Sequence, residues 1–429
     1  MATIIDPTHK PIMLDQASDK PWVKPLAAEG YHGLAGYITK TIAPYTEADP
    51  VAILLQLLVA FGNLIGRSAY YMVESTRHYA VLFAVIVGQT AKARKGTSWG
   101  HVERLLTAAD PEWAKHCLMQ ASPTGEGIIW ALRDPIYMLR GGVRELVDTG
   151  AADKRLMLAL GEYVSVLTQC RRPGSSLSGV LRNGWDGGPL ASLTKNHPSK
   201  ATGAHLSIAA HIVMDELKRS LKPVDISNGL ANRTLFGCAR RSQLLPDGGQ
   251  VPDGEMQLLS EQLHEATTWA KKVGRVIRDR EADTLWRDIY PVLSRDRDGV
   301  VGAICARTEA QVIRLAMIHA LLNKSAVITV NHLQAALAMW NYCEESAQFV
   351  FGDVGQKRSD ADVLFLALQQ HPEGLDRTQI HGLFSRNRKA SEINDALFQL
   401  MADEKVQRKT VPSAGGRPSD VFVAVQAAS

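Results

Sequence analysis

Several features that mark particular protein classes are missing from this 429-residue chain. Its five cysteines include no C-x-x-C pair, which excludes a disulfide framework and a cysteine-rich zinc site. No apolar run approaches the roughly eighteen residues of a membrane helix, and the first residues carry Asp and Pro where a secretory signal has an apolar block. Internal repeats and low-complexity tracts are also missing. We therefore expect a soluble, cytoplasmic protein with reduced cysteines and no membrane partner.

A large excess of charge of either sign is missing as well. Lys and Arg number 48 against 44 Asp and Glu, which gives a net charge of +4 and a pI near 8.7. This balance permits a polyanionic partner without requiring one, so local clusters of charge matter more than the total. Hydrophobic residues make up 45% of the chain. That content and the length predict a large core and two or three domains.

The most informative segment present is residues 81–98, VLFAVIVGQTAKARKGTS. An apolar run ends at Gly88, as a buried strand does, and a basic loop then leads into a helix start. A triphosphate site needs backbone N–H groups aimed at oxygens, a cation and a hydroxyl for magnesium. Lys95 supplies the cation, and Thr97 or Ser98 supplies the hydroxyl. The predicted nucleotide-binding residues are Gly88, Thr90, Ala91, Lys92, Ala93, Arg94, Lys95, Gly96, Thr97 and Ser98.

This loop departs from the standard G-x-x-x-x-G-K-[ST] pattern. Lys95 lies one place further from Gly88, and Gly96 separates it from Thr97. A basic turn between a core strand and a surface helix is therefore the alternative interpretation. If the segment is a phosphate loop, ATP and Mg²⁺ are the expected cofactors.

Strands and helices alternate around this loop, which predicts an α/β fold with a mostly parallel sheet. The segment at 50–66 is apolar nearly all round, with Asp49 as its cap and Pro50 in its first turn. We expect this helix to be buried against the sheet. Apolar runs predict strands over residues 68–74, 77–88, 115–121, 153–163, 203–213 and 231–242.

Composition divides the chain into four parts. Residues 1–25 are interrupted by Pro and charge, which predicts an extended arm, and residues 26–250 hold the α/β core with its N-terminal helices. A Pro/Gly-rich stretch at 243–256 is typical of a linker, here to a helical region at 251–355 that packs on the core. Residues 356–429 predict three helices and a β-hairpin, which is the order of a winged helix.

Three polar residues follow or end predicted strands, at the sheet edge where open α/β sheets bind ligands. Glu126 is a candidate to orient the attacking water, or else a charge that compensates a helix N-terminus. Glu162 can help to hold magnesium, or is a plain surface acid. His211 can sense the γ-phosphate, or is a core histidine bonded to the backbone.

Arg233, Arg240 and Arg241 flank the apolar run at 234–239. Arginine suits transition-state charge because its planar donors pair with phosphate oxygens, and in ring ATPases the adjacent subunit supplies it. The three together predict an arginine finger in an oligomer, whereas each one taken singly is typical of a surface arginine.

Basic residues gather in two further places. The segment 181–203 is long and rich in Gly, Asn and Lys, and Lys195, Asn196 and Lys200 are candidates to track a nucleic-acid backbone. A solvated loop is the alternative for this segment. In the C-terminal module acids such as Glu392 dilute the basic residues, so protein binding competes with DNA binding there. The candidate DNA contacts in the module are Arg386, Arg388, Lys389, Arg408, Lys409 and Arg417.

The ordered motifs VGQTAKARKGTSWG, PTGEGIIWALRDP, DKRLMLALGEYVSVL and ANRTLFGCARRS resemble the RecA-type P-loop ATPases related to hexameric replicative helicases of phages, plasmids and integrated elements. The resemblance implies a RecA-like core with Lys95 and Thr97 as the Walker A pair and Glu126 as the water-activating acid. It also implies Glu162 as the Walker B acid, His211 as the sensor, and an arginine near 233–241 as a finger in trans. Related sequences carry a run of acids before the Glu162 position, where this chain has Leu and Gly.

These observations predict a ring-forming, hexameric, DNA-stimulated NTPase that acts as a helicase or helicase-like replication protein of a mobile element. The expected nucleic-acid partners are single-stranded DNA and, at the C-terminal module, duplex DNA. No primase-type segment precedes the core, so we expect a separate primase or initiator as a partner. The alternative is a nucleotide-switched DNA-binding initiator or loader that hydrolyses ATP weakly or not at all. A small-molecule kinase is a third interpretation, but it would need a substrate lid, which is not evident.

Overall fold

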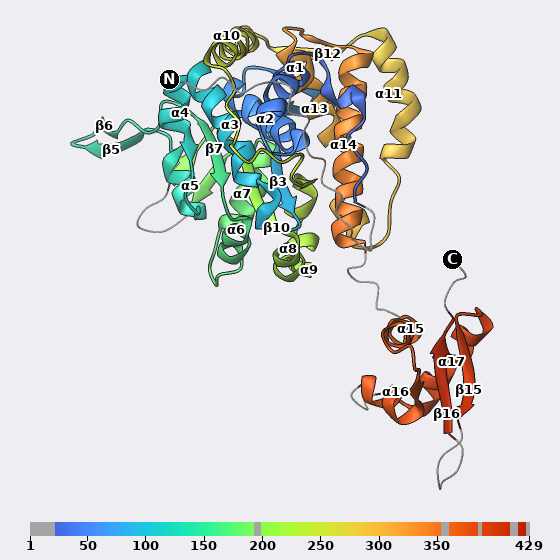
Figure 1. Ribbon diagram of the computed structural model, residues 1–429. Coiled ribbons are helices and arrows are strands. Elements are labelled where there is room, and N and C mark those ends of the chain that lie inside the picture. The colour runs from blue at the N-terminus through green and yellow to red at the C-terminus, as the bar shows by residue number, and fades with distance from the viewer. Residues whose placement is uncertain (1–21, 193–198, 353–359, 385–387, 412–418, 426–429) are drawn as a thin grey trace. The chain divides into compact units, whose positions relative to one another are not determined.

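The computed structural model of the chain describes every residue except 1–21, 193–198, 353–359, 385–387, 412–418 and 426–429 (Figure 1). The chain forms two compact units, Met1–Gly352 and Asp353–Ser429. Most of the arm predicted at residues 1–25 falls outside the described residues. None of the helices in the described ranges is long and apolar enough to span a bilayer.

A five-stranded parallel sheet organises the first unit. Its order is β4-β7-β10-β3-β11, and every neighbouring pair is parallel. The central strands are buried along their length, as the continuous apolar runs predict. The predicted α/β class with a mostly parallel sheet is confirmed. The strands are Phe83–Gly88 (β3), Leu118–Met119 (β4), Arg155–Leu160 (β7), His205–Val213 (β10) and Thr234–Ala239 (β11).

Helix α2 (Pro50–Ile65) covers one face of this sheet. Asp49 caps it by accepting a hydrogen bond from a backbone N–H of the first turn at 3.0 Å, and Gly66 ends it with a φ of +66°. All residues of the helix after Pro50 are buried. The helix packs on β3, β7, β10 and β11, so the prediction of a helix buried against the sheet is confirmed.

The connections put the helices that follow β3 and β10 on opposite faces of the sheet. From β3 the chain passes through α3 (Lys95–Ala109) to the far edge strand β4, whereas β10 leads through α8 (Met214–Ser220) across β3 to β11. Right-handed crossovers that run in opposite directions along a sheet lie on opposite faces. Accordingly, α3 packs on α2, and α8 packs on α6 (Tyr163–Cys170). The carboxyl ends of β3 and β10 are therefore the switch point at which such sheets bind ligands.

Two strand predictions are wrong in extent. The run at 77–88 is split into β2 (Thr76–Tyr79), which joins another sheet, and β3, because a tight turn intervenes in which the Val81 N–H donates to the Tyr79 carbonyl at 2.8 Å.

The segment at 115–121 begins as the end of helix α4 (Pro111–Cys117), and only two residues of it form β4. The physical reason is a strong helix start that the strand prediction overlooked. Asp110 caps the helix by accepting from the Trp113 N–H at 3.0 Å, and a proline occupies the first turn.

A second sheet ties the helical region to the core. Its order is β13-β12-β1-β2, and it pairs β1 (Tyr70–Val73) with β12 (Arg275–Arg278) from the other side of the 243–256 stretch. That stretch is itself held by the core, because Gln243 Nε2 donates to carbonyl groups within residues 43–46, the shortest at 2.8 Å. These residues therefore do not form the free linker that their composition predicted.

Other elements of the first unit include a two-stranded hairpin, β5–β6, that projects from the body in Figure 1. The helices are α1 (Gly33–Ile42), α5 (Gly125–Ala131), α7 (Leu177–Asp186), α9 (Pro223–Ser227), α10 (Asp253–Ala270), α11 (Arg280–Leu293), α12 (Gly299–Ile304), α13 (Thr308–Leu322) and α14 (Val330–Phe351). The strands are β5 (Ile136–Arg140), β6 (Val143–Asp148), β8 (Leu190–Ser192), β9 (Ser199–Ala201) and β13 (Val327–Ile328).

The described residues of the second unit form three helices and a three-stranded antiparallel sheet of order β14-β16-β15. Its own core gathers apolar side chains from every element, among them Leu364, Ile380, Leu397 and Phe422. Helix α16 begins with a capping box, in which Asp376 and Gln379 each accept from the other's backbone N–H at 2.8 Å. The elements are α15 (Asp360–Gln370), β14 (Leu375–Asp376), α16 (Arg377–Leu383), α17 (Ala390–Ala402), β15 (Val406–Val411) and β16 (Ser419–Ala424).

Candidate functional site

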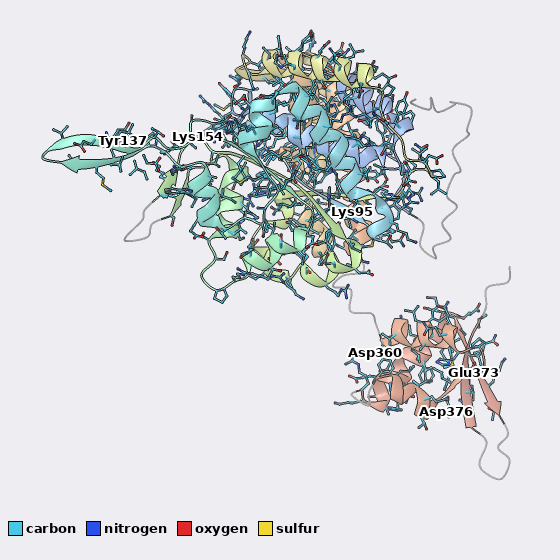
Figure 2. All side chains as sticks on the ribbon, turned by 60° about the vertical axis from the view of Figure 1, so that its left-hand side comes forward. Lys95, Tyr137, Lys154, Asp360, Glu373 and Asp376 are labelled. Atoms are coloured by element: carbon cyan, nitrogen blue, oxygen red, sulfur yellow. The ribbon has the colours of Figure 1, made fainter. Side chains whose placement is uncertain are left out.

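The predicted phosphate loop leaves the central strand β3 and turns sharply before helix α3. Gly88 ends the strand, and a 3₁₀ turn follows at Ala91–Ala93. Arg94 then adopts a left-handed conformation, with φ +55° and ψ +29°, that redirects the chain into the helix. Lys95, labelled in Figure 2, is the first helical residue. The segment is thus a strand, loop and helix at the carboxyl edge of the sheet.

The Lys95 side chain folds back over this loop. Its Nζ donates to the Thr90 carbonyl at 3.1 Å, and it lies 2.6 Å from the position that a Cβ on Gly88 would take. Glycine at position 88 therefore leaves the room that the lysine occupies. Burial lowers the pKa of the Lys95 ammonium, and the nearby Glu216 carboxylate opposes that shift. A buried cation at a helix N-terminus is an arrangement that an anion stabilises.

The two candidate magnesium hydroxyls differ in their surroundings. Ser98 is fully buried, and its Oγ donates to the Lys95 carbonyl at 2.6 Å and accepts from Gln56 Nε2 at 3.0 Å. Thr97 is exposed on the first turn of α3. Of the two hydroxyls, that of Thr97 is the one placed to meet a ligand from solvent.

His211 lies two residues before the end of the neighbouring strand β10, opposite Ile86 of β3. Its Nε2 is 3.2 Å from Gln56 Nε2, and because an amide nitrogen only donates, this hydrogen bond requires the imidazole tautomer in which Nε2 accepts. Burial, with the charge of Lys95 as a second cause, lowers the pKa of His211 to about 4. The imidazole is therefore neutral at pH 7 and joined through Gln56 to the helix that carries Lys95.

Two of the predicted arginine positions meet at one carboxylate. Arg94 Nε donates to Glu47 Oε2 at 2.6 Å, and Arg241 Nε lies 3.5 Å from the same oxygen. Burial alone would raise the pKa of Glu47, but a hydrogen bond from the Leu245 N–H and the two guanidinium groups hold it below its usual value. Arg240 is exposed beside them at the carboxyl end of β11, and its backbone N–H donates to Asp49.

Arg233 does not belong to this group. It precedes Thr234, which pairs with Phe83 at the amino end of β3. Arg233 therefore lies at the amino ends of the strands, whereas Lys95 lies at their carboxyl ends. The residue is 6% exposed and its guanidinium is bound internally, at 2.7 Å to both Asp186 Oδ2 and the Gly229 carbonyl. The expected cluster of three arginines is therefore divided, because the strand between them spans the sheet.

The two predicted acids lie at the carboxyl edge but at different distances from the loop along the sheet. Glu162 is exposed at the start of α6, directly after β7 and one strand from β10. Glu126 follows the edge strand β4, and its Oε1 accepts from Ser176 Oγ at 2.7 Å. That hydrogen bond, with one from its own backbone, lowers the pKa of Glu126. The Glu126 carboxylate is therefore ionised at neutral pH.

Within the described residues, no group of three or more His, Cys, Asp or Glu side chains gathers as a ready metal site. Magnesium does not need one, because it is commonly held by one or two protein oxygens together with substrate phosphates and water. An exposed hydroxyl at Thr97 and an exposed carboxylate at Glu162 are compatible with that mode of binding.

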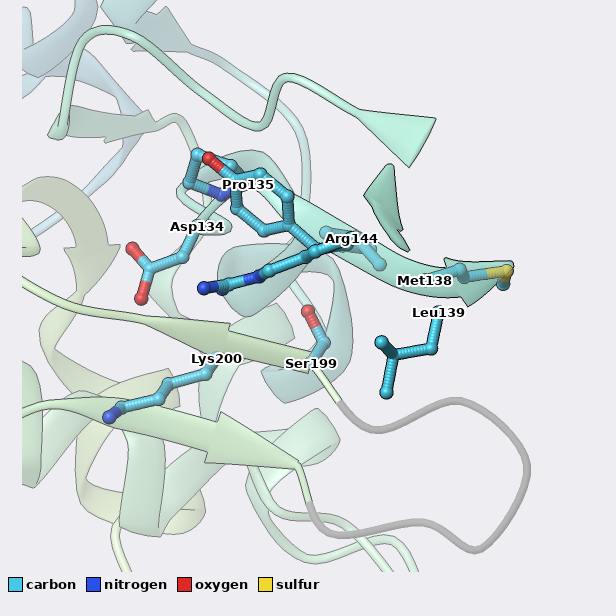
Figure 3. Close-up of a pocket in the computed structure, with 9 residues that line it drawn as sticks. Asp134, Pro135, Met138, Leu139, Arg144, Ser199 and Lys200 are labelled. Atoms are coloured by element: carbon cyan, nitrogen blue, oxygen red, sulfur yellow. The ribbon is translucent and has the colours of Figure 1, made fainter. Parts of the chain in front are cut away.

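Part of the segment predicted as a long DNA-contacting loop forms secondary structure among the described residues. Helix α7 runs to Asp186, and β8 pairs with β9. Lys200 is exposed on β9 and lines a cavity of about 420 Å³ (Figure 3). Arg144 lines the same cavity, and its Cζ lies 4.1 Å from the centroid of the Tyr137 ring. Lys195 and Asn196 lie outside the described residues.

The basic residues of the second unit include several that are paired internally. Arg388 Nε is 3.0 Å from the Asp360 carboxylate, and Arg408 is 2.7 Å from Asp420. Lys389 is exposed at the start of α17, and Lys409 is exposed on β15. Arg386 and Arg417 fall outside the described residues.

Sequence analysis missed three residues that meet the loop. Gln56 carried a signal, because it is a polar residue within the apolar helix α2, and Glu216 carried a weaker one as an acid that follows β10. Glu47 carried none, since its partner Arg94 lies 47 residues away in the chain. Contacts of this kind arise only when distant segments fold together.

A scan against models of known protein families and a search of curated proteins both find no match for this chain.

Proposed function

We propose that this chain is a RecA-type P-loop ATPase, related to the hexameric replicative helicases of phages, plasmids and integrated elements, that binds ATP with Mg²⁺. The observation that carries the proposal is the Lys95 ammonium folded back over Gly88 and Thr90, at the N-terminus of the helix that follows the central strand. The loop lies at the switch point of a parallel sheet, where ligands of such folds bind.

Each residue of the site takes a role that its surroundings suit. The loop N–H groups and Lys95 bind the phosphates, and Thr97 with Glu162 holds magnesium. Bound magnesium supplies charge neutralisation at the phosphate oxygens. Glu126 orients the attacking water, and neutral His211 reports the state of the γ-phosphate to the loop. Arg240 and Arg241, at the same edge of the sheet, are better placed than Arg233 to meet the nucleotide site of an adjacent subunit.

The second unit is proposed to be a winged helix that contacts DNA or a protein partner. Three helices followed by an antiparallel hairpin support this assignment. The core would form a ring, which a finger in trans requires, and would move along single-stranded DNA. A separate primase or initiator would act with it.

A second candidate function is a nucleotide-switched initiator or loader with weak hydrolysis. The observation that favours it is the tie between Glu126 and Ser176, which occupies one carboxylate oxygen of the proposed water-activating acid. In such a protein the loop would bind nucleotide as a structural switch, and the second unit would select the DNA.

One experiment separates the two functions. The ATPase rate of the purified full chain is measured with and without single-stranded DNA, and the mass in solution is recorded with and without nucleotide. The helicase proposal expects a rate that rises with single-stranded DNA and a mass of several subunits. Nucleotide binding with negligible turnover supports the switch, and a chain that binds no nucleotide overturns both.

A further inference from the structure

Helix α2 carries two buried amides in an otherwise apolar sequence. Gln56 and Asn63 are both 0% exposed, and they lie seven residues apart, which places them on the same face two turns apart. A buried amide costs free energy unless it is hydrogen-bonded. The contacts of each amide therefore indicate why a polar side chain is present there.

Asn63 has a structural role that its contacts account for. Its Nδ2 donates to the Leu156 and His205 carbonyls at 3.0 and 3.3 Å, and its Oδ1 accepts from Trp113 Nε1 at 2.9 Å. Leu156 and His205 lie near the amino ends of β7 and β10, far along the helix from the phosphate loop. Asn63 thus satisfies both halves of its amide and fastens α2 to the sheet.

Gln56 is different, because its contacts join the two sides of the switch point. Its Nε2 donates to Ser98 Oγ on α3 at 3.0 Å and lies 3.2 Å from His211 Nε2 on β10. Ser98 Oγ in turn donates to the carbonyl of Lys95 at 2.6 Å. A continuous series of buried hydrogen bonds therefore runs from the proposed sensor to the backbone of the phosphate-binding lysine.

The oxygen of the Gln56 amide lowers the stability of the fold. Its Oε1 is buried and has no hydrogen-bond partner among the described residues, and leaving such an atom unsatisfied is costly. An apolar side chain of similar size would fill the site without that cost. A glutamine at this position is therefore explained by the two contacts of its Nε2, with Ser98 and His211.

We propose that Gln56 is a positioning residue that couples the first turn of α3 to His211. This inference rests on the proposed ATPase function and adds a residue to it. When Lys95 engages a phosphate, a shift of the first turn of α3 moves Ser98, and the Gln56 amide passes that shift to the His211 imidazole. The coupling acts through two hydrogen bonds of the Gln56 amide, so replacing the amide by an apolar group abolishes the coupling.

The test compares Gln56→Met with Asn63→Leu in the full chain. Both changes replace a buried amide on the same helix by an apolar group of similar size. Two readouts are used: amide hydrogen exchange of residues 95–102 without nucleotide, and the imidazole signals of His211 in ¹⁵N-histidine-labelled protein as ATPγS with Mg²⁺ is added. Neither readout requires turnover.

We expect Gln56→Met to speed exchange in the first turns of α3 by about tenfold, because a buried hydrogen bond to Ser98 is removed, and to abolish the response of His211 to ATPγS. Asn63→Leu should lower the unfolding temperature more, yet leave the His211 response intact. If Gln56→Met does not fold, Ser98→Ala replaces it, since this change cuts the same series of bonds from the other end.

The proposal is overturned if Gln56→Met leaves exchange and the His211 response as in the natural chain, or if Asn63→Leu changes both equally. Failure of the proposed function is recognised separately, because the natural chain then shows no response to ATPγS. In that case the exchange comparison still decides whether Gln56 positions α3.

Discussion

Gly88 and Lys95 depend on each other sterically, and this dependence gives the sharpest test at the scale of single residues. A Cβ at position 88 would lie 2.6 Å from Lys95 Nζ and 2.8 Å from the Ala93 Cβ. Gly88→Ala should therefore displace the lysine and weaken binding of a fluorescent ATP analogue by about tenfold or more. Gly100→Ala, on the same helix as Lys95, is the matched control, because a Cβ there meets nothing within 4 Å. Equal effects of the two changes would contradict the proposed loop geometry.

The position of the phosphate-binding cation is tested by replacing basic residues of the same loop one at a time. Lys95→Ala should abolish nucleotide binding while circular dichroism and the unfolding temperature stay close to those of the natural chain. Lys92 is exposed on the 3₁₀ turn, so Lys92→Ala should weaken binding little. If Lys92→Ala or Arg94→Ala abolishes binding and Lys95→Ala retains it, the register of the loop is wrong.

At the scale of elements, one ion pair joins the end of α7 to the start of β11. Arg233 is buried and donates to Asp186, the last residue of α7, at 2.7 Å. Arg233→Ala removes the donor to Asp186 and to the Gly229 carbonyl, and leaves Asp186 with the longer contact to Arg307 Nη1 at 3.6 Å. It should therefore lower the free energy of unfolding by about 1–3 kcal/mol in urea titrations. Asp186 is 41% exposed at its side chain, which keeps the destabilisation below that of a fully buried pair.

Arg240→Ala is the control for this measurement, since the Arg240 side chain is exposed. We expect it to change the unfolding free energy by less than about 0.5 kcal/mol. A larger loss of stability for Arg240→Ala than for Arg233→Ala would contradict this assignment. If the Arg233→Ala protein is stable and binds nucleotide but does not hydrolyse it, Arg233 is the arginine finger.

At the scale of the whole molecule, buried histidines make stability depend on pH. Burial lowers the pKa of His205 and of His319 to about 3, and that of His211 to about 4. The unfolded chain, with histidine pKa values near 6.5, binds these protons first, so stability is full above about pH 6.5 and declines as pH falls toward 4. Each such histidine adds a slope that approaches about 1.4 kcal/mol per pH unit.

Urea titrations of the full chain at pH 7.5, 6 and 5 check this expectation. His319→Leu should reduce the slope of the unfolding free energy against pH by the contribution of one proton. The reason is that His319 is 1% exposed and neither ring nitrogen has a hydrogen-bond partner among the described residues. A free energy of unfolding that stays constant between pH 7.5 and 5 would contradict the neutral, buried state of these side chains.

The division of labour between the two units is also a property of the whole molecule. The second unit has its own core, so deletion of residues 353–429 should leave the first unit folded with its basal nucleotide binding unchanged. Binding of duplex DNA should weaken, and the slope of its salt dependence should fall by roughly one unit for each phosphate that the second unit neutralises. Unchanged DNA affinity and salt slope after the deletion would assign the second unit to a protein partner.

The local features of this protein follow from its sequence because they depend on neighbours in the chain. Continuous apolar runs marked the buried strands β3, β10 and β11, and Asp49 with Pro50 marked the start of α2. The phosphate-loop candidate also came from adjacent residues, since a glycine, a basic loop and a helix start are read in order. The three helices and the hairpin of the second unit were predicted on the same basis, whereas the short strand β14 was not.

Tertiary structure decided what depends on contacts between distant segments. Arg233 and Arg240 lie at opposite ends of β11, a separation that the predicted strand already implied, whereas only folding brings Glu47 to Arg94 and Gln56 between Ser98 and His211. The split of the 77–88 run has a local cause instead, because Thr76–Tyr79 pairs with β1 in a tight hairpin and a turn at 79–81 separates it from β3. Local pattern specifies which residues can form an element, whereas packing specifies which partners that element meets.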